Sequence, residues 1–200
     1  MKQIKRFWFP GALVIMCAVI VLIIWQPSLG SDSKLRDFGA APEFELVDTE
    51  GNIVSLNNTK GKVRLAYFFF SNCPDVCPPT TAMLSKLQTE LKTRDIFAEE
   101  TAIFSITFDP NRDTTEQLLK YSAIYNVDPT GWSFLRGDED YTIKLAKDLS
   151  ISIIKDQQGN FLHQNMFVLI DDVGRIRAWY DASDLDLTIE EIAEDMDGLT

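Results

Sequence analysis

An apolar stretch that runs directly into two closely spaced cysteines constrains this chain more than any other feature. Leu65 to Phe70 is apolar throughout, and the segment Ser71 to Thr80 follows it with the sequence SNCPDVCPPT. Three residues separate Cys73 from Cys77 within that segment. A buried strand that delivers two thiols into a proline-bounded turn, followed by a helix, is typical of redox pairs and of metal sites.

The first residues have the pattern of a membrane anchor. Lys2, Lys5 and Arg6 precede the run from Phe7 to Trp25, which is nearly all apolar. That run is long enough to cross a hydrocarbon core of roughly 30 Å, and its basic flank predicts a cytoplasmic N-terminus. We therefore expect residues 1–29 to be a cytoplasmic N-terminus and transmembrane helix. The protein would then be a single-pass protein of the cell membrane with an extracytoplasmic C-terminal domain.

A cleaved signal peptide is the competing interpretation of the same segment. The apolar run ends at Trp25-Gln26-Pro27 without a small-x-small cleavage site. A lipoprotein signal is disfavoured because Met16 is bulky where the residue before Cys17 needs to be small. These features favour an uncleaved anchor. Residues 30–41 then form a polar linker, and residues 42–200 have the size of one domain.

The charge of the chain outside the anchor is strongly acidic. Three of the 19 basic residues lie before Phe7 and none of the 30 acidic residues lies before Asp32, which leaves 16 basic against 30 acidic residues and a formal charge of −14. Such a surface repels nucleic acid and favours cationic partners or metal ions. The simpler explanation of the charge is solubility.

Hydrophobic periodicity predicts an α/β domain. We expect strands over residues 42–47, 53–56, 63–70, 102–108, 166–170 and 175–180, and helices over residues 81–91, 116–125, 141–149 and 188–196. The first two strands form a hairpin around Asp48–Asn52. The remaining order of strand, helix, strand, helix, strand hairpin and helix is that of the thioredoxin-like fold. The fold class is thus α/β, thioredoxin-like with an added N-terminal β-hairpin, preceded by one transmembrane helix.

The cysteine pair allows three interpretations. Cys73 and Cys77 are a redox pair, the ligands of one soft metal ion, or a plain disulfide, although such a short loop would gain little stability from a disulfide. We expect Cys77 to lie at the start of a helix, where free N–H groups and the helix dipole would lower its pKa.

His163 is the sole histidine in the 200 residues. A lone histidine is usually incidental, but in a thioredoxin-like fold the loop before the late strand 167–170 lies beside the cysteine loop. Two thiolates and one imidazole suit copper, as Cu(I) or Cu(II), better than hard ions. Met83 and Met166 are further soft donors, yet both fit core-facing positions and are better explained by packing.

Three segments resemble the Sco family, which comprises copper-handling assembly factors of cytochrome c oxidase. They are Phe70–Pro78 with its Cys-x3-Cys-Pro signature, Ser105–Thr114 with Asp-Pro-x-Arg-Asp, and the His163 segment that runs into Val168–Asp171. The resemblance extends from about residue 41 to the C-terminus. It implies that Cys73, Cys77 and His163 are copper ligands.

The resemblance also gives a role to the acidic segment. Asp109, Arg112 and Asp113 match a loop that we expect to support the site, with Arg112 pairing with either acid. The simpler alternative is that Asp113 only caps the helix that follows. Many members of the family have Asp before the histidine, whereas Leu162 stands there in this chain, so the acidic partner of His163 is missing.

Two functions from different classes follow. The first is a membrane-anchored copper chaperone and assembly factor for the binuclear copper site of cytochrome c oxidase subunit II, with a copper donor protein as a further partner. The second is a thiol–disulfide oxidoreductase that uses Cys73 and Cys77 to reduce the oxidase cysteines without carrying copper, and that itself needs a thiol reductant. His163 discriminates between them, because a reductase needs no imidazole there. Neither function involves nucleic acid.

Overall fold

A five-stranded mixed sheet forms the centre of the domain. The computed structural model describes residue 16 and residues 35–200. The strand order is β5-β4-β3-β8-β9. The strands β3 (Val63–Phe69), β4 (Thr101–Thr107) and β5 (Trp132–Leu135) are parallel to one another. The strand β8 (Met166–Ile170) pairs antiparallel with both β3 and β9 (Ile176–Asp181). Every residue of β3 and β4 is buried, as expected for central strands covered on both faces.

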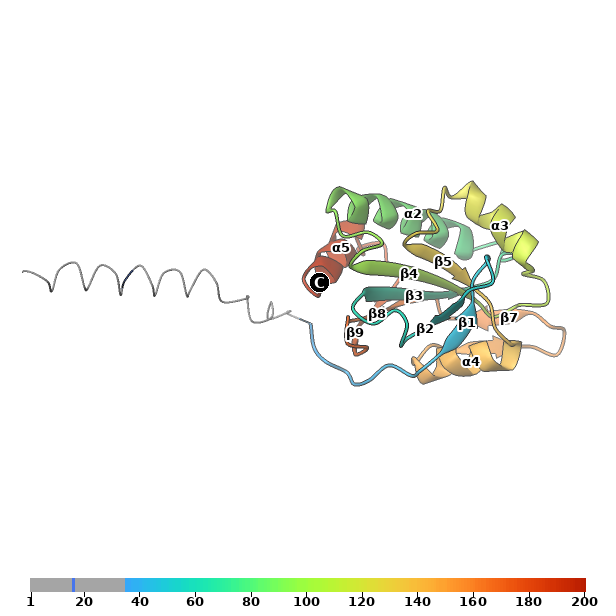
Figure 1. The fold of residues 1–200 in the computed structure, drawn as a ribbon. Helices are drawn as coiled ribbons and strands as arrows, with labels where there is room; N and C mark the ends of the chain where they lie inside the picture. Colours follow the sequence, from blue (N-terminus) through green and yellow to red (C-terminus); the bar gives the residue numbers. More distant parts are fainter. Residues whose placement is uncertain (1–15, 17–34) are drawn as a thin grey trace, which may run out of the picture. The chain divides into compact units, whose positions relative to one another are not determined.

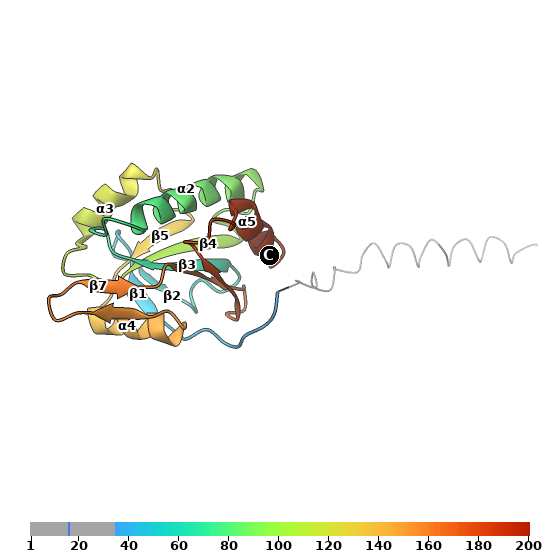
Figure 2. The ribbon, with the colours of Figure 1, turned by 180° about the vertical axis from the view of Figure 1, so that it is seen from behind.

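Helices cover both faces of this sheet. The helices α2 (Cys77–Thr93) and α3 (Thr115–Ile124) lie over one face, with α5 (Ile189–Asp197) beside α2, and α4 (Glu139–Asp148) lies over the other face (Figures 1 and 2). The parallel strands are connected through α2 and α3, and the β8–β9 hairpin and α5 complete the chain. This order confirms the predicted thioredoxin-like α/β fold.

Two small hairpins are attached to the sheet. The predicted N-terminal hairpin is present as β1 (Glu45–Val47) and β2 (Ile53–Ser55). A second hairpin of β6 (Ile153–Lys155) and β7 (Phe161–His163) was not predicted. Its strands have three residues each, which is too short for an alternating pattern to be recognised.

Several predicted boundaries differ from the observed ones. The helix after the cysteine loop, α2, begins at Cys77 rather than at residue 81. Pro78 and Pro79 fit its first turn, because no backbone N–H is required there. The edge strand β5 was missed, since four residues with a polar Ser133 in the middle give a weak signal. His163 was placed in a loop but is the last residue of β7.

The predicted anchor, apart from residue 16, and residues 30–34 of the predicted linker lie outside the described residues. Within the described part of the chain, no helix is both long enough and apolar enough to span a membrane. Residues near the start of the described segment contact the domain: the Phe38 N–H donates to the Ile176 carbonyl at 2.9 Å, and Ala41 is buried.

Candidate metal centre

Three potential ligand atoms converge at one end of the sheet. Cys73, Cys77 and His163 place their two sulfurs and an imidazole nitrogen within 4.8 Å of one another. Cys77 Sγ lies 3.9 Å from His163 Nε2. Both cysteines are buried free thiols, and His163 is partly buried. The start of α2 and the strand β7 lie at the same end of the sheet in both views of the fold (Figures 1 and 2).

The cysteine loop is anchored by a carboxylate that follows β4. The Ser71 N–H donates to Asp113 Oδ2 at 3.0 Å and the Ser71 hydroxyl donates to Oδ1 at 2.5 Å. The hydroxyl of Thr107 donates to the same carboxylate, which is fully buried. Asp113 is therefore a support of the site, and the alternative that it caps helix α3 is wrong, because Thr114 is the N-cap.

The other two residues of the acidic segment form an ion pair. Arg112 pairs with Asp109, whose carboxylate is almost completely buried. The guanidinium lies 5.9 Å from the ring centroids of both Phe70 and Phe161, so it covers the aromatic side chains that adjoin the site. Pairing with Asp109 holds this cation in place, in agreement with the predicted supporting role of the segment.

The orientation of the His163 ring exposes one nitrogen to the thiols. Nδ1 lies 3.0 Å from the Gln164 carbonyl oxygen, which favours a proton on Nδ1 and leaves the lone pair of Nε2 facing Cys77. A backbone carbonyl thus takes the place of the missing acidic partner, while Leu162 is 73% exposed and turned away. Burial lowers the pKa of His163, which keeps the imidazole neutral and able to bind a metal.

The prediction that the pKa of Cys77 is lowered is wrong for the metal-free thiol. Burial raises the pKa of Cys77 to about 12, although the Phe70 backbone N–H and the Tyr67 hydroxyl act in the opposite direction. The helix start cannot compensate, because Pro78 and Pro79 have no N–H to donate. Near neutral pH this sulfur therefore stays almost entirely protonated until a cation or a covalent bond takes the place of the proton.

A buried hydrogen bond connects α2 with the residues that follow β7, and the sequence did not reveal it. Asn165 Nδ2 lies 3.0 Å from Thr80 Oγ1, in the first turn of α2, and 3.1 Å from Ser183 Oγ. Thr80 is three residues after Cys77, and Asn165 is two residues after His163. This contact joins α2 to the short link between β7 and β8, directly after the histidine strand.

The methionines considered as further ligands pack against the core. Met83 and Met166 are both partly buried against the main hydrophobic cluster. That placement agrees with their interpretation as packing residues. The donor set is then two sulfurs and one imidazole nitrogen, which fits a soft or borderline ion such as copper and suits magnesium or calcium poorly.

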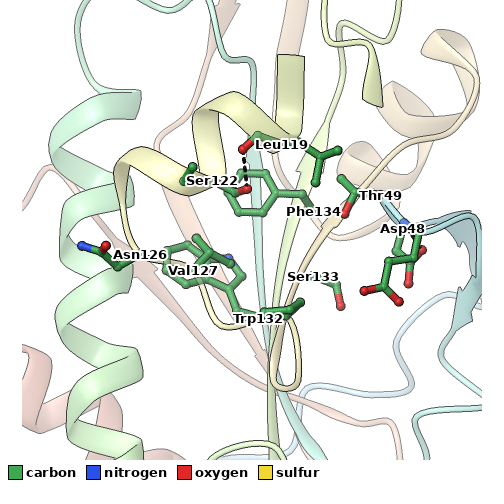
Figure 3. Close-up of a pocket in the computed structure, with 12 residues that line it drawn as sticks. Asp48, Thr49, Leu119, Ser122, Asn126, Val127, Trp132, Ser133 and Phe134 are labelled. Atoms are coloured by element: carbon green, nitrogen blue, oxygen red, sulfur yellow. Dashed lines mark hydrogen bonds between the residues drawn. The ribbon is translucent and has the colours of Figure 1, made fainter. Parts of the chain in front are cut away.

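A separate pocket of about 340 Å³ lies on the β5 edge of the sheet. Its apolar side includes Leu119, Val127 and Phe134, and Asp48 stands across from them in the turn between β1 and β2 (Figure 3). None of the three metal-ligand candidates lines it. The Asp48 carboxylate accepts hydrogen bonds from the backbone of its own turn, so it is already engaged.

Comparison with known proteins identifies close similarity over most of the chain. Residues 33–200 match the SCO1/SenC family. The SCO1 protein homolog of Bacillus subtilis is 35% identical over 140 residues, which cover 66% of this chain and 69% of that protein.

Solved structures agree with this similarity. BsSco, described as a member of the Sco family of cytochrome c oxidase assembly proteins with a disulfide switch, superimposes with a TM-score of 0.73 and 29% identity over 82% of this chain and 96% of that one. Bradyrhizobium japonicum ScoI with copper bound gives a TM-score of 0.65 and 26% identity over 80% and 99% of the two chains.

Proposed function

Because this chain belongs to the SCO1/SenC family, we propose that it is a membrane-anchored copper chaperone for the binuclear copper site of cytochrome c oxidase subunit II. The observation that carries the proposal is the convergence of Cys73, Cys77 and His163 within 4.8 Å. Copper is the metal that suits this set of donors, and it is bound in the solved structure of a family member. In this proposal the two sulfurs and His163 Nε2 hold copper as cargo.

The geometry also explains how metal could be held and released. Two of the three ligands lie on one short segment, and the third is on β7, close to the Thr80–Asn165 contact. Oxidation of Cys73 and Cys77 to a disulfide removes both thiolate ligands, so copper binding and disulfide formation compete for the same sulfurs. Reduction of the pair is then a condition for loading.

The second function, thiol–disulfide oxidoreductase, is favoured by one observation. Cys73 and Cys77 are both free thiols whose sulfurs lie within the 4.8 Å cluster, so a small movement would bring them to bonding distance. In that reaction the two thiols would lose two electrons and two protons to a disulfide of the oxidase subunit. The pair would become a disulfide, and the subunit would gain two thiols.

We further propose that the domain is extracytoplasmic and tethered by residues 1–29. The basic residues before the apolar run support this orientation, and the oxidase copper site is the partner that it would face. A copper donor or a thiol reductant on the same side of the membrane would prepare the protein for each cycle.

Mixing experiments with the copper-free soluble domain of subunit II discriminate between the two functions. With the acceptor cysteines reduced, the chaperone predicts that copper leaves the loaded chain and appears on the acceptor. With the acceptor oxidised, the reductase predicts that copper-free reduced chain yields acceptor thiols while Cys73 and Cys77 become a disulfide. The double variant with Cys73→Ser and Cys77→Ser is the control for both. If wild-type chain neither transfers copper nor reduces the acceptor, the proposal is wrong.

A further inference from the structure

The hairpin that carries His163 lies outside the central sheet. Its strands β6 and β7 have three residues each and form a separate two-stranded sheet. A two-stranded hairpin is only marginally stable by itself in water. The position of the third ligand candidate therefore depends on the side chains that attach this hairpin to the rest of the domain.

Arg112 contacts both the hairpin and the cysteine side of the site. Its guanidinium carbon lies 5.9 Å from the ring centroid of Phe161, on β7, and 5.9 Å from that of Phe70, which directly follows β3. Its Nη2 lies 3.5 Å from the carbonyl oxygen of Gly159, in the hairpin turn. One side chain from the loop after β4 thus joins the histidine hairpin to the strand that leads into the cysteines.

Arg112 is itself held in place by its own loop. Its Nε pairs with the carboxylate of Asp109, which is almost completely buried. The backbone N–H groups of Arg112 and Asp113 donate to the Asp109 carbonyl at 3.1 and 2.9 Å. Because Asp113 also accepts hydrogen bonds from Ser71 in the cysteine loop, the same short segment contacts both halves of the metal centre.

Aromatic rings fill the space between Arg112 and His163. The ring centroids of Phe161 and Phe108 are 5.0 Å apart, and that of Phe108 is 5.2 Å from the imidazole. Phe70 lies 5.8 Å from Phe161 and 6.0 Å from the imidazole. Rings at such separations attract one another in preferred orientations. A contact that holds the hairpin at Phe161 therefore also holds the imidazole in front of the thiols.

Lys155 attaches the hairpin to a different element. Its ammonium pairs with Glu139, the first residue of α4, and lies 5.0 Å from the Phe161 ring centroid. The helix α4 lies beside β6 (Figure 2). Loss of Arg112 should therefore loosen the hairpin on the cysteine side while Lys155 still holds it to α4, so an effect of moderate size is expected.

Resting on the proposed function, we propose that Arg112 is a positioning residue that holds the β6–β7 hairpin, and with it His163, against the cysteine loop, and so slows the release of copper. A guanidinium has no lone pair to offer a metal, so Arg112 acts through the aromatic rings and not as a ligand. Two cation–π contacts of a half-exposed side chain correspond to about 5–30-fold in the equilibrium between a held and an open hairpin.

Access to His163 can be measured without any metal. Both ring nitrogens face protein atoms, since Nε2 lies 3.9 Å from Cys77 Sγ and Nδ1 lies 3.0 Å from the Gln164 carbonyl oxygen. Diethylpyrocarbonate transfers an ethoxycarbonyl group to an imidazole nitrogen with loss of ethanol and carbon dioxide, and therefore needs an open hairpin. His163 is the sole histidine, so the absorbance of ethoxycarbonyl-histidine reports this residue alone. Arg112→Gln should raise the modification rate of the reduced, copper-free chain by about 5–30-fold.

Release of copper is measured on the loaded chain. Reduced chain carrying Cu(I) is mixed with bathocuproine disulfonate, at concentrations where the rate no longer depends on the chelator. Cu(I) exchanges the protein donors for chelator nitrogens, and no electron is transferred. Arg112→Gln should release copper about 5–30-fold faster than wild type, because the imidazole leaves the site more often.

A double-mutant cycle separates the contact with the hairpin from a general loss of stability. Arg112→Gln also leaves the buried Asp109 carboxylate without its partner, so a lower urea midpoint is expected from this cause alone. Phe161→Leu removes the ring and keeps that ion pair. The effect of Arg112→Gln on the modification rate should be smaller in the Phe161→Leu background than in wild type. Equal effects in both backgrounds would contradict the inference.

The matched control is Arg94→Gln. Arg94 forms ion pairs with Glu90 at 2.9 Å and with Asp197 at 3.2 Å, at the end of α2 opposite to Cys77. Any loss of urea stability in this variant should leave the modification of His163 and the release of copper unchanged. An equal acceleration in Arg94→Gln and Arg112→Gln would show that general instability, and not the contact with the hairpin, exposes the imidazole.

The remaining outcomes are distinct. If reduced wild-type chain binds no copper, the chaperone proposal fails, and the modification rate of His163 alone decides whether Arg112 holds the hairpin. If Arg112→Gln matches wild type in that rate, the inference is wrong, whether or not copper binds. Faster modification with an unchanged rate of copper release would also overturn it, because the held hairpin would then have no part in retaining the metal.

Discussion

Cys77 Sγ lies 3.9 Å from His163 Nε2, across the contact between the start of α2 and the end of β7. The sulfur and the nitrogen come from positions 86 residues apart in the chain. Nδ1 of the same ring is turned to the Gln164 carbonyl, so the ring is oriented before any metal arrives. This pairing distinguishes the site from a simple dithiol and determines what each of the following experiments should show.

Replacement of His163 by alanine should weaken copper binding more than the loss of any supporting residue. Loss of an outer hydrogen bond usually costs about 10–100-fold in metal affinity, so loss of a ligand should cost at least about 100-fold for Cu(II). Equilibrium titration of the reduced chain measures the effect. Leu162→Ala, which alters an exposed neighbour, is the control and should bind copper normally. Equal affinity in His163→Ala and wild type would exclude the imidazole as a ligand.

The two thiols should differ in reactivity when no metal is bound. Cys77 has no exposed surface and a pKa of about 12. At pH 8 its thiolate fraction is then roughly one part in ten thousand. Iodoacetamide should therefore modify Cys73 well before Cys77, as measured by mass spectrometry of the peptides that contain each cysteine. Faster labelling of Cys77 would show that the helix start outweighs burial.

Removal of the Asp113 carboxylate should loosen the cysteine loop. Asp113→Ala leaves the Ser71 and Thr107 donors unsatisfied, which should cost about 2–4 kcal/mol in urea unfolding. Copper affinity should fall as well, because Ser71 immediately precedes the Asn72–Cys73 segment. Thr114→Ala removes only the α3 cap and should cost about 0.5–2 kcal/mol with unchanged copper affinity. Equal copper affinity in Asp113→Ala and wild type would show that Asp113 does not support the metal centre.

The ion pair of Asp128 and Lys92 predicts a pH dependence away from the site. The hydrogen bond from Lys92, together with those from Thr130, lowers the pKa of Asp128 from 3.8 to about 2. Since the folded-state pKa is the lower one, the stabilisation is fully present above about pH 4 and is lost as the pH falls through about 2.

Asp128→Asn should therefore destabilise the protein by about 0.5–1 kcal/mol at pH 7, a value limited by the partial exposure of the pair. The difference from wild type should shrink as urea unfolding is repeated between pH 5 and pH 2.5. A difference that stays constant over this range would mean that the carboxylate contributes through its shape and not through its charge.

Local sequence patterns predicted much of the fold and of the candidate site. The apolar run of β3 and the proline-bounded cysteines are contiguous, so their relation could be inferred without tertiary information. The position of His163 beside the cysteines could be inferred because, in a thioredoxin-like fold, the segment before the late strand lies next to the cysteine loop. The Asp109–Arg112 pair was one of two pairings that the spacing allowed.

The features that were missed depend on tertiary contacts or on a balance of opposing effects. The three-residue strands β6 and β7 carry no readable periodicity, yet they place His163. The Thr80–Asn165 hydrogen bond joins residues far apart in the chain. The pKa of Cys77 was predicted in the wrong direction, because burial outweighs a helix start whose next two residues are prolines.

Copper binding by the reduced and the oxidised chain is the measurement that tests the central claim most directly. Cu(II) is titrated into the chain with Cys73 and Cys77 reduced, and into the same chain after they have been joined as a disulfide. The three-ligand site predicts one copper per reduced chain, with intense thiolate-to-Cu(II) absorption, and a loss of tight binding on oxidation. Absence of tight binding by the reduced chain, or equal binding by both forms, would contradict it.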